Sequence, residues 1–125
     1  AMDKSVEAKA LIVGPIMSRN AIEAYKAGVA ISFGTDAGTF PHGKNAVEFE
    51  LLAKAGIPII DTILAATTNA AKLLAAADDI GSVQAGRYAD IIATDTNPLE
   101  DVTALQRVSF VMKGGAVVKD AALAQ

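Results

Sequence analysis

The stretch that decides the fold is GVAISFGTDAG, residues 28–38. Larger and smaller side chains alternate along it, as in a β-strand, where successive side chains point to opposite faces. The larger ones are Val29, Ile31 and Phe33, and the smaller ones are Ala30, Ser32 and Gly34. Because neither face carries a charge, we expect a strand that is buried on both faces, as in parallel sheets covered by helices.

The loop that follows, FGTDAGTFPHGKN at residues 33–45, allows three interpretations. The first is a nucleotide-binding loop, because GTFPHGKN comes close to the pattern G-x-x-x-x-G-K-[ST]. Against it, Asn45 replaces the hydroxyl residue that would bind magnesium, and Pro41 removes one backbone N–H. The second is an aspartyl phosphotransferase loop, which would need aspartates where Thr35 and Ala37 stand.

The third interpretation concerns Asp36, which would lie at the C-terminal end of the buried strand. In α/β barrels the chemistry occurs at that end of the strands. A carboxylate there can bind a divalent cation and can transfer a proton. An Asx-turn or a helix-capping role for Asp36 is the structural alternative. The single histidine of the chain, His42, is equally well interpreted as a solvated loop residue.

Helices are expected on both sides of this strand and loop. The segment SRNAIEAYKAG predicts a helix that Ser18 caps and Gly28 ends. The segment NAVEFELLAKAG predicts a second helix, in which Asn45 and Glu48 form a capping box and Gly56 ends the helix.

A third helix, PIIDTILAAT, should begin at Pro58 and break near Thr67, where Thr68 caps a short final helix. The character of the sequence then changes from helical to β-rich. We expect two short strands around a glycine turn within residues 80–95, a single helical turn in NPLEDVTAL, and a hairpin about Gly114–Gly115.

The composition excludes several classes of protein. The chain has 125 residues, 52% of them hydrophobic and 20% charged, which is enough apolar material for a core. A net charge of -3 without any basic cluster argues against a nucleic-acid partner. The absence of cysteine excludes disulfides. Because no apolar run approaches the roughly 20 residues of a membrane span and no signal peptide is visible, we expect a cytoplasmic protein.

Several motifs occur together and in a fixed order: GVAISFGTDAG, PHGKN, AGIPIIDTILAATTNAAKLL, IGSVQAGRYADIIATDTNPLEDV and VMKGG. Over about residues 17–119 they resemble the C-terminal part of the metal-dependent amidohydrolases. The branch concerned holds imidazolonepropionase-like enzymes, prolidase-like dipeptidases and Xaa-Arg/Lys carboxypeptidases. The resemblance implies an α/β fold with an incomplete barrel. Residues 1–78 would supply the last strand and helices of a TIM (β/α)₈ barrel, and residues 79–125 the C-terminal strands of a small β-sandwich.

The resemblance also implies roles for individual residues. Asp36 matches the aspartate that in this family binds the metal and carries the proton. His42 and Asn45 match a loop at the mouth of the site, where they would contact the substrate. Asp90 falls in the sandwich part and is expected to be structural. The implied cofactor is a divalent metal, zinc in one or two ions, and the implied substrate is a small molecule or dipeptide.

This sequence also departs from the family pattern. The family needs an H-x-H pair and further histidines on earlier strands, whereas this chain has one histidine. Most metal ligands would therefore come from residues that the chain lacks. Ile57 also stands where relatives place a capping Thr or Ser. A full barrel needs about 250 residues.

Because the barrel is incomplete, we expect as partner either the missing N-terminal barrel portion or further copies of the chain. Two functions follow from the sequence. One is hydrolysis of an amide or peptide bond by metal-activated water, with Asp36 supplied by this chain. The other is a non-catalytic fragment or assembly unit that is inactive alone.

Overall fold

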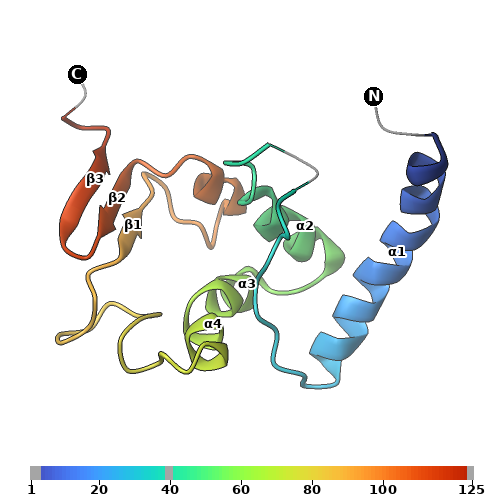
Figure 1. Cartoon of the computed structure of the whole chain (residues 1–125), viewed down its shortest axis with the longest axis horizontal. Coiled ribbons are helices and arrows are strands. Elements are labelled where there is room, and N and C mark those ends of the chain that lie inside the picture. The colour runs from blue at the N-terminus through green and yellow to red at the C-terminus, as the bar shows by residue number, and fades with distance from the viewer. Residues whose placement is uncertain (1–3, 39–40, 124–125) are drawn as a thin grey trace.

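The computed structural model describes residues 4–38 and 41–123 (Figure 1). Four α-helices come first in the chain, and three short strands follow. The helices are α1 (Lys4–Lys26), α2 (Val47–Ala55), α3 (Ile59–Ala66) and α4 (Thr68–Leu73). The strands are β1 (Ile91–Ala93), β2 (Phe110–Lys113) and β3 (Ala116–Asp120), with the 3₁₀ helix η1 (Val102–Gln106) between β1 and β2. Helices α2, α3 and α4 lie between α1 and the sheet (Figure 1).

Helix α1 is longer than the sequence predicted. It begins at Lys4, so Ser18 lies inside the helix and its hydroxyl donates to the carbonyl of Gly14 at 3.2 Å. The prediction that Ser18 caps the helix is therefore wrong. The helix continues through the residues before Ser18, Gly14 and Pro15 included, although both of these residue types disfavour helix interiors. The predicted end is confirmed, because Gly28 has the left-handed φ of 77°.

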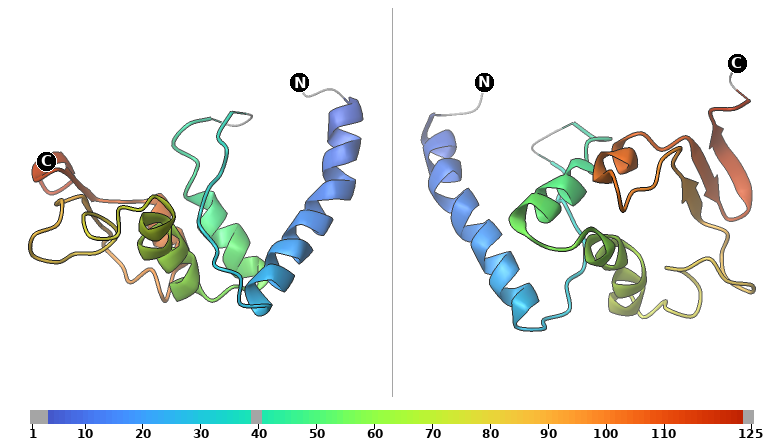
Figure 2. Two further views of the ribbon diagram at one scale, coloured as in Figure 1. Left: turned by 60° about the horizontal axis from the view of Figure 1, so that its bottom comes forward. Right: turned by 180° about the vertical axis from the view of Figure 1, so that it is seen from behind.

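The side chains in the middle of α1 are not buried by the rest of the described molecule. Residues 11–20 are all exposed, and Leu11 and Met17 are 74% and 65% exposed. Only the last turns pack, and there the Tyr25 hydroxyl donates to Oδ2 of Asp61 on α3 at 2.5 Å. Figure 2 shows α1 standing apart from the other helices along most of its length. An apolar helix in this state has a face without a partner.

The segment expected to be a buried strand is not a strand. Residues 29–37 run as an elongated trace without helix or turn, and no strand pairs with them in the described part of the chain. The expected burial on both faces is also wrong, since Val29 is 55% exposed. A β-strand exists only where a neighbour completes its hydrogen-bond ladder. Residues 29–37 find no such neighbour within residues 4–38 and 41–123.

The buried core is small and lies around α3 and α4. Its fully buried residues are mostly of small volume, namely Ile57, Thr62, Ala65, Ala71 and Ala104. Ile57 is 4% exposed, so its side chain packs in the core in place of the cap expected from relatives. Helix α3 ends at Ala66, as the sequence predicted. The residue that precedes α4 is Thr67, not Thr68, and it forms no side-chain cap.

The predicted capping box of α2 is not formed. The helix begins at Val47 after Ala46, and no side chain caps it. The Asn45 amide nitrogen donates to the Thr35 hydroxyl instead, and the helix starts one residue later than a cap at Asn45 would require. The predicted end of α2 is confirmed, because Gly56 is left-handed with φ 107°.

The β-rich part forms one antiparallel sheet in the order β1-β2-β3. The predicted hairpin is confirmed, with Lys113 opposite Ala116 and positive φ at Gly114 and Gly115. Of the two short strands expected within residues 80–95, only β1 forms. The preceding residues make turns, in which the Tyr88 N–H donates to the carbonyl of Asp79 at 2.9 Å.

None of the helices in the described part of the chain combines the length and apolar character needed to cross a membrane.

Candidate functional site

Asp36 lies at the end of the elongated segment and has a left-handed backbone, with φ 44°. A short polar side chain makes this conformation acceptable for Asp, whereas most residues avoid it. The extended geometry therefore stops at Asp36, and the residue does not continue the small face of the preceding stretch. The side chain is exposed. In this conformation the Asp36 carboxylate is accessible to groups outside the described residues.

Residues 41–46, which precede α2, are folded back against the elongated segment. The Asn45 amide donates to the Thr35 hydroxyl at 2.7 Å, which ties the start of α2 to the residue before Asp36. The Lys44 N–H donates to the carbonyl of Pro41 at 3.3 Å and closes a turn. Asn45 is thus brought close to the backbone that carries Asp36. His42 lies in the turn and is exposed to solvent.

An open pocket of about 300 Å³ lies beside this hydrogen bond. It combines an apolar wall with one basic, one acidic and one amide side chain. Its lining residues are Thr35, Lys44, Asn45, Val47, Glu48 and Leu51. Of the three site residues that the sequence predicted, only Asn45 lines the pocket. The structure does not bring Asp36 or His42 into it.

Two aromatic rings and two hydrogen bonds hold the elongated segment in place. Phe33 stacks on Phe49 of α2 with ring centroids 4.3 Å apart, and its N–H donates to the carbonyl of Ala65 at 3.0 Å. The Asn69 amide on α4 donates to the carbonyl of Ile31 at 3.2 Å. Sequence reasoning missed this role of Asn69. The available signal was an amide side chain next to the apolar residues Ala70 and Ala71, where its polar groups need a partner.

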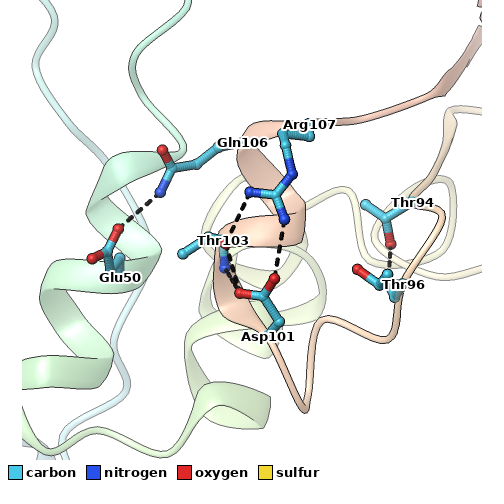
Figure 3. Close-up of polar contacts among 7 residues, drawn as sticks. All are labelled: Glu50, Thr94, Thr96, Asp101, Thr103, Gln106 and Arg107. Carbon is cyan, nitrogen blue, oxygen red and sulfur yellow. Dashed lines mark hydrogen bonds and ion pairs between the residues drawn. The ribbon is translucent and has the colours of Figure 1, made fainter.

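Helix α2 is held from its other side by η1 (Figure 3). The Gln106 amide donates to Oε2 of Glu50 at 2.9 Å. The Lys54 ammonium donates to the other carboxylate oxygen at 2.5 Å, and these two hydrogen bonds, Lys54 first, lower the pKa of Glu50. Gln106 also lines a small cavity against residues 43–47. The loop that carries the candidate site residues therefore packs against the C-terminal part of the chain.

A compact hydrogen-bond network shapes η1 itself (Figure 3). Oδ1 of Asp101 accepts from the hydroxyl and the N–H of Thr103 at 2.6 and 3.0 Å. Arg107 donates to Oδ2 of Asp101 at 3.0 Å. The Thr103 hydrogen bonds, and then Arg107, lower the pKa of Asp101. The network is a helix cap and an ion pair, which accounts for it structurally.

The residues present do not make a metal centre by themselves. No group of three or more His, Cys, Asp or Glu side chains comes together within residues 4–38 and 41–123. A tetrahedral zinc site takes three or four protein ligands, and Asp36 supplies at most one. That the other ligands come from outside this chain stays a prediction.

Comparison with known proteins identifies the family. The model of the amidohydrolase family matches residues 13–118. The ochratoxinase of Aspergillus niger is 39% identical over 101 residues, which are 77% of this chain and 21% of that protein. The imidazolonepropionase of Shouchella clausii is 39% identical over 61 residues, 46% of this chain and 14% of that protein.

Solved structures agree with the sequence comparison. A Xaa-Pro dipeptidase with methionine bound in its active site has a TM-score of 0.88 and 42% identity, over 94% of this chain and 29% of its own. The A. niger ochratoxinase structure has a TM-score of 0.77 and 35% identity, over 94% of this chain and 28% of its own. The chain thus spans between a fifth and a third of the length of these two relatives. Since the family match covers most of its residues, the chain belongs to the amidohydrolase family.

Proposed function

We propose that this chain is the Asp36-bearing part of an enzyme that hydrolyses an amide or peptide bond in a small substrate. The observation that carries the proposal is the place of Asp36, an exposed carboxylate at the end of the elongated segment, in a chain of the amidohydrolase family. A carboxylate in this position accepts a proton from the attacking water and returns it to the leaving nitrogen. A divalent metal, which this family generally uses, would take its other ligands from outside the chain.

The substrate class follows from the relatives and from the pocket beside the site. The similar proteins include a Xaa-Pro dipeptidase and an ochratoxinase. The pocket beside Thr35 and Asn45 carries Lys44 and Glu48, whose opposite charges suit the two charged ends of a dipeptide. We therefore propose a dipeptide or a similar acyl amino acid as substrate, with His42 and Asn45 at the mouth of the site.

The test uses a single-chain fusion in which this chain replaces the matching part of the Xaa-Pro dipeptidase. Asp36→Asn should lower kcat by about 10²- to 10⁴-fold, because an amide cannot exchange the proton. Asn tolerates the left-handed backbone as Asp does, so the fold should not change. The readout is hydrolysis of a Xaa-Pro dipeptide, together with the circular dichroism spectrum and the melting temperature.

A matched control is Asp78→Asn, which removes another exposed carboxylate far from the candidate site in the sequence. It should leave kcat and KM unchanged. If Asp36→Asn retains more than a few per cent of the rate, Asp36 does not transfer the proton.

A second candidate function is a non-catalytic assembly unit. The observation that favours it is the lack of any three-residue metal-ligand group in the described part of the chain. This alternative predicts no hydrolysis by the fusion with any divalent metal added. Turnover by the fusion that depends on Asp36 would exclude it.

His42 gives a finer test of the substrate-binding proposal. His42→Ala in the same fusion should raise KM and leave kcat nearly unchanged, since the residue would bind substrate without entering the chemistry. KM values for several dipeptides provide the measurement. Identical values for the variant and the parent would return His42 to the role of a solvated loop residue.

A further inference from the structure

One side-chain hydrogen bond connects the backbone beside Asp36 to the beginning of α2. The Asn45 amide donates to the Thr35 hydroxyl at 2.7 Å, and both residues are partly buried. Thr35 immediately precedes Asp36 in the chain. A movement of Thr35 is therefore passed directly to the residue that carries the candidate carboxylate.

The donor of this hydrogen bond is held by the helix that follows it. The Asn45 carbonyl accepts from the Glu48 N–H at 3.1 Å, so Asn45 belongs to the turn that leads into α2. From this turn its amide reaches back to the end of the elongated segment. The donor position is thus set by α2, and the acceptor position by the segment that carries Asp36.

A second contact joins the same two elements but has a different character. Phe33 and Thr35 are two residues apart, so in an elongated backbone their side chains lie on the same side. Phe33 stacks on Phe49 of α2, with ring centroids 4.3 Å apart. Stacked rings keep the segment close to the helix, whereas a hydrogen bond also prefers one direction. The bond between Asn45 and Thr35 therefore orients the end of the segment.

Asp36 is a residue that needs such orientation. Its φ of 44° lies in the left-handed region, which residues other than glycine keep only where their surroundings hold them. Its side chain is exposed. A group that takes part in catalysis must be held within about 0.5 Å of its working position. The contacts of the preceding residue are well placed to do this.

We propose that Asn45 and Thr35 are positioning residues, whose hydrogen bond holds Asp36 in the orientation that proton transfer requires. The inference rests on the proposed function, because it explains how the carboxylate of that reaction is aimed. It assigns Asn45 a role exerted through Thr35. The resemblance to the family predicted contact between Asn45 and the substrate instead, and the two roles have different kinetic consequences.

The rate test uses the single-chain fusion described above. Asn45→Ala and Thr35→Val each remove the hydrogen bond. Each should lower kcat by about ten- to a hundredfold, because a misplacement of about 1 Å can cost that much in rate. KM should change by less than about twofold, since neither side chain would bind substrate. Thr35→Ser keeps the acceptor oxygen and should retain nearly the parental kcat.

The double variant shows whether the two residues act as one unit. Thr35→Val combined with Asn45→Ala should be no slower than the slower single variant, because the same hydrogen bond is lost only once. Direct contact between Asn45 and the substrate predicts a different pattern. In that case Asn45→Ala raises KM, Thr35→Val has no effect, and the two losses add.

A matched control separates positioning from stability. Gln106→Ala also removes an amide hydrogen bond to α2, the one to Glu50 at 2.9 Å on the other side of the helix. It should lower the melting temperature and leave kcat unchanged. All rates are measured well below the lowest melting temperature of the set, so that every variant is folded. An equal loss of kcat in Gln106→Ala and Asn45→Ala would overturn the inference.

A measurement without metal or substrate tests the geometry directly. In the 125-residue chain, ¹⁵N relaxation gives the order parameter of the Asp36 amide. This value should fall from about 0.85 in the parent to about 0.6 in Asn45→Ala and in Thr35→Val. Thr35→Ser and Gln106→Ala should keep the parental value.

Three further outcomes would overturn the inference. One is an unchanged Asp36 order parameter in both variants that lack the hydrogen bond. Another is additive losses of kcat, and the third is a raised KM in Asn45→Ala with no effect of Thr35→Val. The proposed function fails separately, when the fusion shows no turnover or Asp36→Asn keeps its rate. The order parameters still decide in that case whether the hydrogen bond holds Asp36.

Discussion

The C-terminal hairpin and the segment at residues 29–35 are both rich in β-forming side chains, yet only the hairpin makes a sheet. Strand β2 finds β3 two residues away across the Gly114–Gly115 turn, and β1 joins its other edge. The segment at residues 29–35 contacts helices and Asn45, but no strand, in the described structure. The difference teaches that sheet formation here depends on how far along the chain the partner lies, and not on the β propensity of the strand itself.

Side-chain contacts strengthen the same contrast. Asp90 accepts a hydrogen bond from the Gly114 N–H at 2.7 Å and forms an ion pair with Lys113, so the hairpin turn is bound to the strand before it. The expected structural role of Asp90 is thus consistent with its contacts. The elongated segment depends instead on Phe49, Ala65 and Asn69, which belong to helices. The hairpin region is held by its own strands and turn, whereas the segment is held by helices and by Asn45.

The largest expected effect lies where the chain passes from α4 to the hairpin region. A Cβ at Gly81 would lie 2.7 Å from Cβ of Ala71 and 2.9 Å from the Thr67 carbonyl oxygen, and Gly81 has φ 88°. Gly81→Ala should lower the free energy of unfolding by about 2–4 kcal/mol, through overpacking and backbone strain. Denaturant unfolding measures this value.

Gly86→Ala is the matched control for this prediction. Gly86 has a similar φ of 87°, but nothing lies within 4 Å of an added Cβ. The expected cost is about 1 kcal/mol, from backbone strain alone. Equal losses at the two positions would mean that the hairpin region does not depend on close packing against α4.

A pH titration tests the support that Asp90 gives to the hairpin. The hydrogen bond from Lys113, and then the one from the Gly114 N–H, lower the pKa of Asp90. A carboxyl group with a lowered folded pKa stabilises the fold above its ordinary pKa of about 4, and this stabilisation is lost as the pH falls through the folded value. The melting temperature of the parent should therefore decrease as the pH is lowered from about 4 through the folded pKa of Asp90.

Asp90→Asn should lower the melting temperature at neutral pH and flatten its decline in acid. Asp95→Asn, at an exposed carboxylate in the next loop, should change neither property. If the melting temperatures of the parent and of Asp90→Asn change in parallel with pH, the hairpin does not need this carboxylate.

The smallest effects are expected in the elongated segment, where the Ile31 carbonyl and the Phe33 N–H are hydrogen-bonded to helices. Asn69→Ala removes the hydrogen bond to the Ile31 carbonyl and should lower stability by about 0.5–1.5 kcal/mol. Hydrogen exchange should rank the amides of β2 as the slowest, Phe33 next and Ser32 the fastest. Equal exchange at Ser32 and Phe33 would show that the hydrogen bond from Phe33 to Ala65 does not protect the segment.

Much of the local structure could be predicted from the sequence. Gly28 and Gly56 end their helices with left-handed backbones, and the double glycine at residues 114–115 makes the hairpin turn. These features depend on residues close together in the chain. The caps expected from Ser18 and Asn45 failed, because upstream residues extend α1 and because α2 begins after Ala46, while the Asn45 side chain bonds to Thr35. Neither competitor lies within the short motif that suggested the cap.

The sequence by itself determined the family, the order of the helices and of the C-terminal hairpin, and the position of Asp36 directly after an uncharged β-rich stretch. Only the tertiary structure decided that this stretch stays unpaired within the described residues. It also decided that Asn69 and Ala65 bond to the backbone of the stretch, and that Asn45 bonds to Thr35. The physical reason is that helix ends and hairpin turns depend on neighbouring residues. A strand ladder and a side-chain hydrogen bond depend on which distant groups the whole fold brings within about 3 Å.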